Sequence, residues 1–586
     1  MTADRRLRDG EFPLKGLLLA WAAVCLILLV TGIGRVLTGR FPDPDDVLRL
    51  VQVRDLLAGQ GWFDITQYRI NPPDGTVMHW SRLVDIPLLL VIAALTPLVG
   101  QAAAETTALV LVPFLTFGIA AAALGRLAWR LLGNRAAIFA VLACGFLPSL
   151  LFQFQPMRID HHGWQVASVA VALWAISRRQ ASFSAWVAGI AMAFGASISL
   201  EVLPLAAAFA AVLWVRWWFD YKQRDWLVAY MLGLSLGMLG FYLVTRGTSA
   251  IEYCDAISPA HVAFFLVAVA GTWVIANATK LRGFGLVFLF ALVGGLAAGA
   301  FALISPTCLA TPFAALDPLV DRYWYRLVLE GQPLWKQPVA TWVTALVQLL
   351  AAIGAVIALR LRAMEWMRGW WGEYLFLLLA ATVLGLLVAR SLAFASVIAA
   401  IPLGWLASSL LLRIRQQKAP LASLGLAAII IVLLAPMSLV MAARAVMPAE
   451  ETEVQNVASG ACDVYGNAPL LAKLETGTVI APLDLGPAIL LETEHSVVAT
   501  GHHRAAEAMG DVIRTFTLPV AEAREIARSH GAEYLAMCTD MTEIALYRHE
   551  APDGLAAALV EGEVPDWLER VNLGGPEEFA VYRVAD

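Results

Sequence analysis

The chain has 586 residues, of which 60% are hydrophobic and only 15% are charged, and its mean hydropathy is +0.71. A typical soluble domain has about 45–50% apolar and about 25% charged residues, so this composition excludes a cytosolic enzyme, a nucleic-acid-binding protein and a disordered scaffold. The net charge of −5 is unevenly divided: residues 1–448 have 33 Lys and Arg against 22 Asp and Glu, and residues 449–586 have 8 against 24. The sequence therefore predicts a mildly basic membrane body followed by an acidic soluble domain, and the acidic domain argues against a nucleic-acid partner.

Apolar runs of about 20 residues predict membrane-spanning helices, and loops rich in Lys and Arg stay in the cytoplasm. The first run, 16–37, follows four basic residues between positions 5 and 15, so the N-terminus is predicted to lie inside. The later runs lie at 105–124, 136–153, 163–177, 182–199, 202–218, 226–245, 261–277, 284–304, 339–360, 371–389, 391–411 and 421–443. The shorter run 84–99 has Pro87 and Pro97 near its ends and is interpreted as an interfacial or partly inserted helix.

These 13 predicted spans place the C-terminal domain outside the membrane, which in a bacterial-type cell is the periplasm. The predicted domains are a transmembrane body, 1–445, with long outer loops at 38–104 and 305–338, and an outer α/β domain, 446–586, in which short apolar runs alternate with amphipathic stretches. The expected architecture is thus a multi-span α-helical membrane protein with a periplasmic α/β domain.

The six cysteines lack the close spacing of a zinc site or a redox motif. Cys254 and Cys308 fall in consecutive outer loops, and Cys462 and Cys538 both fall in the outer domain. An oxidising compartment favours a disulfide within each pair over free buried thiols.

Three carboxylates, Asp43, Asp45 and Asp46, follow the first predicted span closely. Clustered carboxylates repel one another unless a cation compensates, and hard oxygen ligands suit Mg²⁺ or Mn²⁺. In the alternative interpretation the same residues form the N-terminus of a helix over 47–57, where acidic side chains cap the backbone and favour the helix dipole. The spacing leaves both open. The same outer loop also carries the candidate residue His79.

A second polar segment lies at an outer helix junction and contains Arg158, Asp160, His161 and His162 in otherwise apolar sequence. A capping role for the Asp-His pair is the alternative. The third segment is the loop 305–339, whose length of about 35 residues suggests a binding loop or lid and which contains Glu330.

Two ionisable residues, Glu201 and Arg390, lie at the outer ends of predicted spans. Placing a charged group there costs free energy, so such residues are functional candidates by default. In the alternative interpretation, the Arg390 side chain extends to the membrane interface. All of these features fall on one side of the membrane. Carboxylates, histidines and arginines at that level suit a lipid-linked phosphate ligand and predict group transfer with a lipid phosphate as leaving group.

At these residues the chain resembles the GT-C glycosyltransferases, and most closely the catalytic subunit of oligosaccharyltransferase. The first loop contains Asp43-Pro44 with Arg49, then Trp62-Phe63-Asp64 and Asn71-Pro-Pro-Asp-Gly, which resemble the family's first-loop motifs in the same order. Asp160-His161-His162 resembles its second acidic motif, and Glu330-Gly-Gln-Pro resembles the motif of its fifth outer loop.

The resemblance implies the GT-C fold and a divalent cation, Mg²⁺ or Mn²⁺, held by Asp43, Asp160 and Glu330 with His162 as a further ligand. Asp43, Asp160 and Glu330 would be the catalytic residues, while Arg390, together with Arg158, would hold the donor phosphate. The chain departs from the family because no Trp-Trp-Asp motif follows position 446, so transfer to asparagine in a sequon is not expected.

The predicted function is transfer of a sugar or oligosaccharide from a polyprenyl phosphate or diphosphate to a protein, lipid or polysaccharide acceptor. The expected protein is a monomer among the lipids of a bacterial inner membrane, with its active site facing the periplasm. A lipid-glycan transporter or flippase is one alternative, although it predicts polar residues through the membrane midplane and repeated halves. A metal-independent glycan polymerase or ligase, which would use Arg and His rather than Asp, is the other.

Overall fold

The protein's structure, a computed structural model, describes residues 11–178, 181–249, 253–278, 282–310, 313, 316–436, 441 and 462–585. The basic residues before position 11, the end of the predicted span 421–443 and the predicted domain boundary at 445 lie outside these ranges. The chain divides into two compact units. The helical unit is Met1–Gly34, Trp80–Thr311 and Leu329–Met447, and the sheet unit is Arg35–His79, Pro312–Val328 and Pro448–Asp586.

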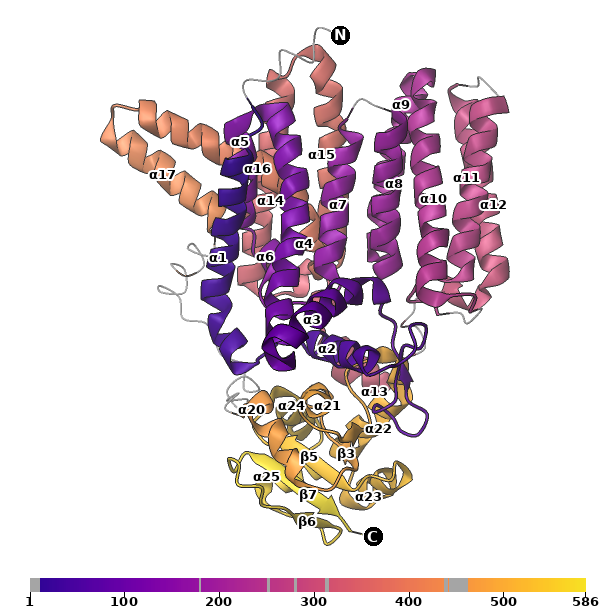
Figure 1. The fold of residues 1–586 in the computed structure, drawn as a ribbon, viewed down its shortest axis with the longest axis vertical. Helices are drawn as coiled ribbons and strands as arrows, with labels where there is room; N and C mark the ends of the chain where they lie inside the picture. The colour runs from indigo at the N-terminus through magenta and orange to yellow at the C-terminus, as the bar shows by residue number, and fades with distance from the viewer. Residues whose placement is uncertain are drawn as a thin grey trace. The chain divides into compact units, whose positions relative to one another are not determined.

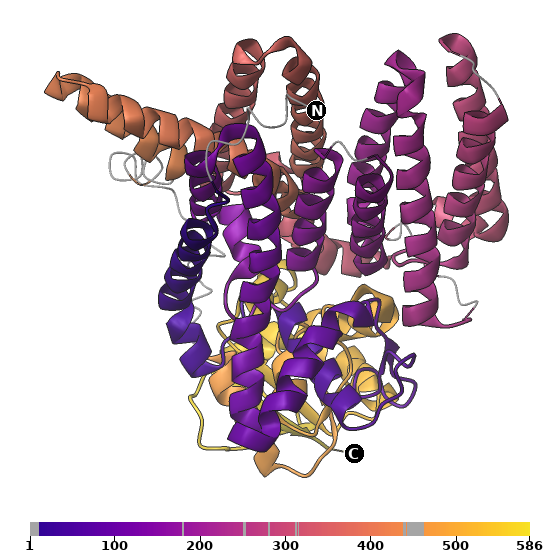
Figure 2. The ribbon, with the colours of Figure 1, turned by 45° about the horizontal axis from the view of Figure 1, so that its top comes forward.

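The helical unit consists of apolar helices, most of which run side by side in Figures 1 and 2, with α11 and α12 at one edge and α17 pointing away from the others. Their bounds are α1 Leu14–Thr38, α3 Asp85–Val99, α4 Gln101–Leu132, α5 Asn134–Cys144, α6 Pro148–Leu151, α7 His162–Ile176, α8 Ala181–Ile198, α9 Leu203–Phe219, α10 Arg224–Arg246, α11 Pro259–Ala278, α12 Phe284–Ile304, α14 Val339–Arg362, α15 Glu365–Leu387, α16 Leu392–Gln416 and α17 Pro420–Leu434. Short 3₁₀ turns at Leu200–Val202, Leu329–Gly331 and Ala389–Ser391 carry Glu201, Glu330 and Arg390.

Within the described residues, 10 helical segments have the length and apolar composition to cross a membrane, and 11 if α5 and α6, which meet at a 74° bend, form one span. Three of the predicted spans correspond to shorter apolar helices, His162–Ile176, Phe183–Ile198 and Pro420–Leu434, so the total of 13 stays a prediction. The segment Arg82–Val99 is among the 10; its residues 84–99 are predicted from the sequence to form an interfacial or partly inserted helix. The expected multi-span helical membrane fold is confirmed.

Helices α8 and α10 pack closely because glycines face each other across their contact. A Cβ atom added at Gly189 would lie 2.2 Å from the backbone oxygen of Tyr230, and one added at Gly233 would lie 2.7 Å from that of Trp186. Small residues at helix contacts let two backbones approach closely in membrane proteins, where lipid supplies no hydrophobic drive for association. These two positions therefore require glycine for packing.

The sheet unit contains the expected C-terminal α/β domain. Its five-stranded sheet has the order β4-β3-β5-β7-β6, with β3 parallel to β4 and β5, and β7 antiparallel to β5 and β6. The strands are β3 Thr478–Ile480, β4 Ser496–Val497, β5 Tyr534–Cys538, β6 Leu568–Arg570 and β7 Phe579–Val584; the helices are α13 Pro318–Val320, α20 Val464–Asn467, α21 Gly486–Glu492, α22 Ala506–Thr517, α23 Val520–Ser529, α24 Thr542–Glu550 and α25 Leu555–Glu561. All five residues of β5 are buried, as expected of a central strand covered on both faces.

Residues 38–79 of the first long loop are part of this unit, whereas residues 80–104 belong to the helical unit. Residues 38–79 form α2 Pro44–Leu57 and a two-stranded ribbon, β1 Thr66–Gln67 with β2 Thr76–Val77. Arg69 donates hydrogen bonds to the backbone oxygens of Leu490, at 2.8 Å, and Thr493, at 2.7 Å, and the amide of Val497 in β4 donates to the backbone oxygen of Arg69 at 2.8 Å. These contacts hold α2 and its aspartates against the C-terminal domain.

Two disulfides join the cysteine pairs that the sequence grouped together. Cys254 is bonded to Cys308 in the helical unit, and Cys462 to Cys538 in the sheet unit, across 54 and 76 residues of sequence. Each bridge closes a long loop and so stabilises its unit chiefly by restricting the unfolded chain.

Elsewhere in the sheet unit, Asp511 on α22 accepts hydrogen bonds from His530 at 2.9 Å and from Arg514 at 2.8 Å. The hydrogen bond from His530, reinforced by that from Arg514, outweighs the effect of burial and lowers the pKa of the Asp511 carboxyl.

Candidate functional site

The Asp160 carboxylate is the centre of a buried polar cluster at the start of α7. Its Oδ2 atom lies 3.4 Å from Nη2 of Arg158 and 3.5 Å from Nε2 of His162, and its Oδ1 atom contacts Nδ1 of His161. All four residues are at least nine-tenths buried. The chain turns sharply here, because Met157 has a φ of 69°, and this turn brings sequence neighbours to face one point.

Burial alone disfavours a charged carboxylate, so the electrostatics of the cluster decide the state of Asp160. Burial raises the pKa of Asp160, but His161, His162 and Arg158 outweigh it and hold the pKa well below its usual range. Asp160 is therefore ionised at neutral pH. An ionised carboxylate surrounded by basic groups can accept a cation in place of one of them, or orient a ligand through the same groups.

A hydrogen-bond chain leads from this cluster to the next helix junction. Nδ1 of His162 lies 3.1 Å from Oε1 of Gln165, one helical turn further along α7, and Nε2 of Gln165 donates to the backbone oxygen of Ser199 at 3.1 Å. Because the amide oxygen of Gln165 can only accept, Nδ1 of His162 donates to it, and Nε2 is the ring nitrogen that faces Asp160. A ring nitrogen in that position is a candidate metal-ligand atom.

Three charged residues, Glu201, Glu330 and Arg390, meet beside this junction. The Arg390 guanidinium contacts Glu201, and its Nη1 atom lies 3.4 Å from Oε1 of Glu330. The backbone amide of Ala389 donates to the backbone oxygen of Gln332 at 3.0 Å, so the Glu330-Gly-Gln-Pro turn is attached to the turn that carries Arg390. Glu201 is within electrostatic reach of both His161 and His162. The structure thus brings together seven of the candidates: Arg158, Asp160, His161, His162, Glu201, Glu330 and Arg390.

The remaining candidates, Asp43, Asp45, Asp46 and His79, belong to the sheet unit. Asp43 is the N-cap of α2, where its side chain accepts a hydrogen bond from the amide of Asp45 at 2.9 Å, and Asp45 and Asp46 occupy the first turn. Of the two interpretations of this motif, the structure therefore contains the capping geometry. A capping carboxylate uses one lone pair, so this role leaves ligand capacity on Asp43.

His79 belongs to a cluster of three imidazoles within the sheet unit. Its Nδ1 atom lies 2.7 Å from Nε2 of His502, and its ring centroid lies 4.9 Å from that of His503. The sequence singles out His79 and offers no signal that it meets residues more than 400 positions away.

Two further polar features of the structure are not predicted from the sequence. Arg82 and Asp85 form an ion pair of 3.4 Å in which both side chains are only 1% exposed, at the start of α3. Gln165 orients His162, as described above. Gln165 could have been recognised from its position three residues after His162, on the same helix face. Asp85 could have been recognised as a charged residue at the start of an apolar run.

Donor atoms of Asp160, His161 and His162 lie within 4.8 Å of one another, which is a spacing that fits one metal ion. The donors are one carboxylate and two imidazoles. Mg²⁺ prefers oxygen ligands alone, whereas first-row transition metals accept imidazole, so this mixed set fits Mn²⁺ or a similar ion better than Mg²⁺.

Comparison with protein-family models gives no match to this chain, and comparison with curated proteins gives none either. Solved structures do match it. The archaeal oligosaccharyltransferase AglB from Archaeoglobus fulgidus, in complex with an inhibitory peptide and a dolichol-phosphate, is similar with a TM-score of 0.64 and 13% identity over 98% of this chain and 77% of that chain.

Two further structures of the Archaeoglobus fulgidus oligosaccharyltransferase match as well. The enzyme tethered to an acceptor peptide with an NVT sequon has a TM-score of 0.64 and 13% identity over 97% of this chain and 74% of the other. Its complex with Zn and sulfate has a TM-score of 0.58 and 14% identity over 97% and 73%. The resemblance to the GT-C glycosyltransferases is therefore confirmed at the level of the fold, which this chain shares over nearly its whole length.

Proposed function

We propose that this protein is an integral-membrane glycosyltransferase that moves a sugar or oligosaccharide from a polyprenyl phosphate or diphosphate to an acceptor on the outer face of a bacterial inner membrane. The observation that carries the proposal is the joint presence of the buried Asp160 cluster and the Glu201, Glu330 and Arg390 group on adjacent helix junctions of this fold. The similar archaeal enzyme binds dolichol-phosphate and an acceptor peptide, which supports a lipid-linked donor here.

In the reaction, the bond between the sugar's anomeric carbon and the phosphate oxygen breaks while an acceptor atom bonds to that carbon. The leaving group is an anionic lipid phosphate, so the site must stabilise developing negative charge. A divalent cation, best Mn²⁺, would neutralise that charge, and Asp160, His162, Glu330 and Asp43 are the proposed ligands. The Zn complex of the similar enzyme supports a metal in this fold.

The chain's own residues have three roles in this scheme. Arg390 and Arg158 present guanidinium groups to the donor phosphate, a geometry that suits bidentate recognition. Glu201 holds Arg390 in position through their ion pair. Asp43 is proposed to orient or deprotonate the acceptor, which general-base catalysis by a carboxylate allows.

The test is transfer in membranes by the variants Asp160→Ala and Asp43→Ala, with the exposed Asp553→Ala as matched control. We expect both site variants to abolish transfer at unchanged protein abundance, while the control transfers normally. Wild-type transfer by both site variants would refute the assignment. The glycoconjugate that is lost from a deletion strain identifies the acceptor, and persistence of transfer in a chelator would favour a metal-independent polymerase or ligase.

A further inference from the structure

A large cavity lies at the end of the helical unit opposite to the candidate site. Its volume is about 930 Å³, and it is lined by the ends of α4, α7, α9, α10, α14 and α15. Because α9 runs from the turn of Glu201 to Phe219 over 17 residues, about 25 Å of helix separates the two ends. Arg390 likewise follows one end of α15, whereas Trp366 at the other end lines the cavity. The cavity is therefore a separate site.

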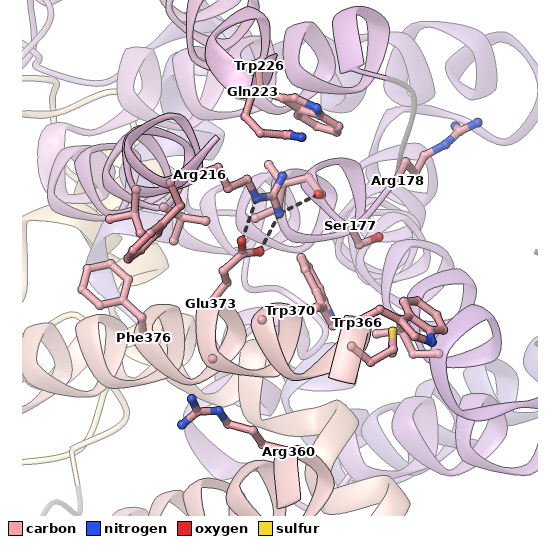
Figure 3. A pocket seen from close by; sticks show the side chains of 18 of the residues that line it. Ser177, Arg178, Arg216, Gln223, Trp226, Arg360, Trp366, Trp370, Glu373 and Phe376 are labelled. Atoms are coloured by element: carbon pink, nitrogen blue, oxygen red, sulfur yellow. Dashed lines mark hydrogen bonds and ion pairs between the residues drawn. The ribbon is translucent and has the colours of Figure 1, made fainter. Parts of the chain in front are cut away.

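An ion pair between Arg216 and Glu373 lies in the middle of the cavity lining. Arg216 donates from Nε and Nη2 to the two carboxylate oxygens of Glu373, at 2.8 and 2.6 Å, and from Nη2 to the backbone oxygen of Ile176 at 3.3 Å. Its guanidinium also lies 5.2 Å from the ring centroid of Trp226. Figure 3 shows this pair in the middle of the view, with Trp370 beside it. Arg216 thus ties α9 to α15 and α7, and its charge is compensated.

Further arginines on the lining carry charge that this pair does not compensate. The lining contains four arginines, Arg130, Arg178, Arg216 and Arg360, and a single acidic residue, Glu373. Among the described residues, Arg178 and Arg360 have no carboxylate partner; Arg178 lies over the Trp174 ring at 5.2 Å. In Figure 3 they lie at opposite margins of the cavity. The lining therefore has an excess of positive charge.

The same cavity has an apolar margin. Phe219, Trp366 and Phe376 line it and are 82%, 41% and 47% exposed. Phe219 and Trp366 lie at the ends of α9 and α15, where exposed aromatic side chains of a membrane protein contact the lipid interface, and Phe376 lies about halfway along α15. A site that combines exposed aromatic side chains with an excess of arginine matches a ligand that has an anionic head and an apolar tail. Basic pockets between membrane helices on the cytoplasmic side bind anionic lipid headgroups in this way.

We propose that this cavity is a binding site for an anionic, phosphate-bearing amphiphile, with Arg178 and Arg360 as the headgroup ligands and Phe219 and Phe376 as contacts of the chain. Two sources share this chemistry, an anionic membrane phospholipid and a polyprenyl phosphate. An alternative explanation of the basic residues is that cytoplasmic loops of membrane proteins are generally rich in Lys and Arg. That tendency does not account for a cavity of this volume between six helices with the Arg216 and Glu373 pair fixed inside it.

The experiment is native mass spectrometry of the purified full-length protein with phosphatidylglycerol, undecaprenyl phosphate or phosphatidylethanolamine as the added lipid. The test variant is R178Q/R360Q. Its matched control is R282Q/R415Q, which removes two exposed arginines that do not line the cavity. Neither test residue forms an ion pair with a described residue, so folding should not depend on them, and R360K provides a variant that keeps the charge.

We expect wild type and control to bind an anionic lipid with equal affinity and R178Q/R360Q to bind it about 25-fold more weakly, at about fivefold for each arginine removed. R360K should retain more binding than R360Q. Preference for phosphatidylglycerol identifies a phospholipid site, and preference for undecaprenyl phosphate a carrier site; either supports the proposal. Equal binding of the anionic lipids by R178Q/R360Q and its control overturns it, as does binding of phosphatidylethanolamine as tightly as either anionic lipid.

Discussion

Arg390 bridges two carboxylates, and a variant at this position separates its structural role from its proposed role in donor binding. The side chains of Arg390, Glu201 and Glu330 are 26%, 22% and 34% exposed. A surface ion pair contributes about 0–1 kcal/mol, and breaking a fully buried one costs about 3–5 kcal/mol because the partner is left uncompensated. Because these side chains are neither fully exposed nor fully buried, R390Q should lower the free energy of unfolding by an intermediate amount, about 1–3 kcal/mol.

The double variant E201Q/R390Q distinguishes the two roles. Removing the charge of Glu201 as well relieves the carboxylate that R390Q leaves unpaired, so thermal stability should recover at least in part. Transfer should not recover, because the guanidinium proposed to hold the donor phosphate is still missing. The assays are thermal unfolding in detergent, followed by tryptophan fluorescence, and transfer in proteoliposomes. An R390Q protein as stable as wild type would refute the structural argument, and transfer restored by E201Q/R390Q would refute the role in donor binding.

Three further predictions concern the metal site, helix packing and pH. His162→Gln should weaken Mn²⁺ binding at least about tenfold by calorimetry; unchanged affinity would exclude this ligand. Gly189→Ala should destabilise the protein by about 1–3 kcal/mol through overpacking, whereas Gly294→Ala, where a Cβ meets nothing within 4 Å, should not. Because the pKa of Asp511 is lowered on folding, its stabilisation is present above its ordinary pKa and is lost on acidification. Asp511→Asn should therefore be less stable than wild type at pH 7 and differ less below about pH 4, while Glu507→Gln should match wild type at both.

The helices were predictable from the sequence because apolar length and flanking basic residues act locally. The run 284–304, for example, coincides with α12, Phe284–Ile304. The sequence is least informative about whether the segment 84–99 spans the membrane, because its length lies near the minimum for a span and its prolines do not end the helix. Pro97 lies inside α3. The α/β domain was predictable in class, but its strand order depends on pairing between distant segments.

The candidate site was predictable in part. Asp160, His161 and His162 are adjacent in sequence, so one turn of chain suffices to bring them together. The contact of Arg390 with Glu201 and Glu330 depends on how three helix junctions pack, and no local pattern encodes it. Asp43 shows a different limit, because an aspartate before a Pro-Asp-Asp turn is both a good N-cap and a good metal ligand.

The central claim is metal-dependent transfer from a polyprenyl-linked donor. Its most direct test is the release of polyprenyl phosphate or diphosphate from a labelled polyprenyl-linked sugar in proteoliposomes, measured with wild type and Asp160→Ala, with and without chelator and added Mn²⁺. Release by wild type should stop in chelator and return with Mn²⁺, and Asp160→Ala should give none under any condition. Release that persists in chelator, or that Asp160→Ala supports at the wild-type rate, would contradict it.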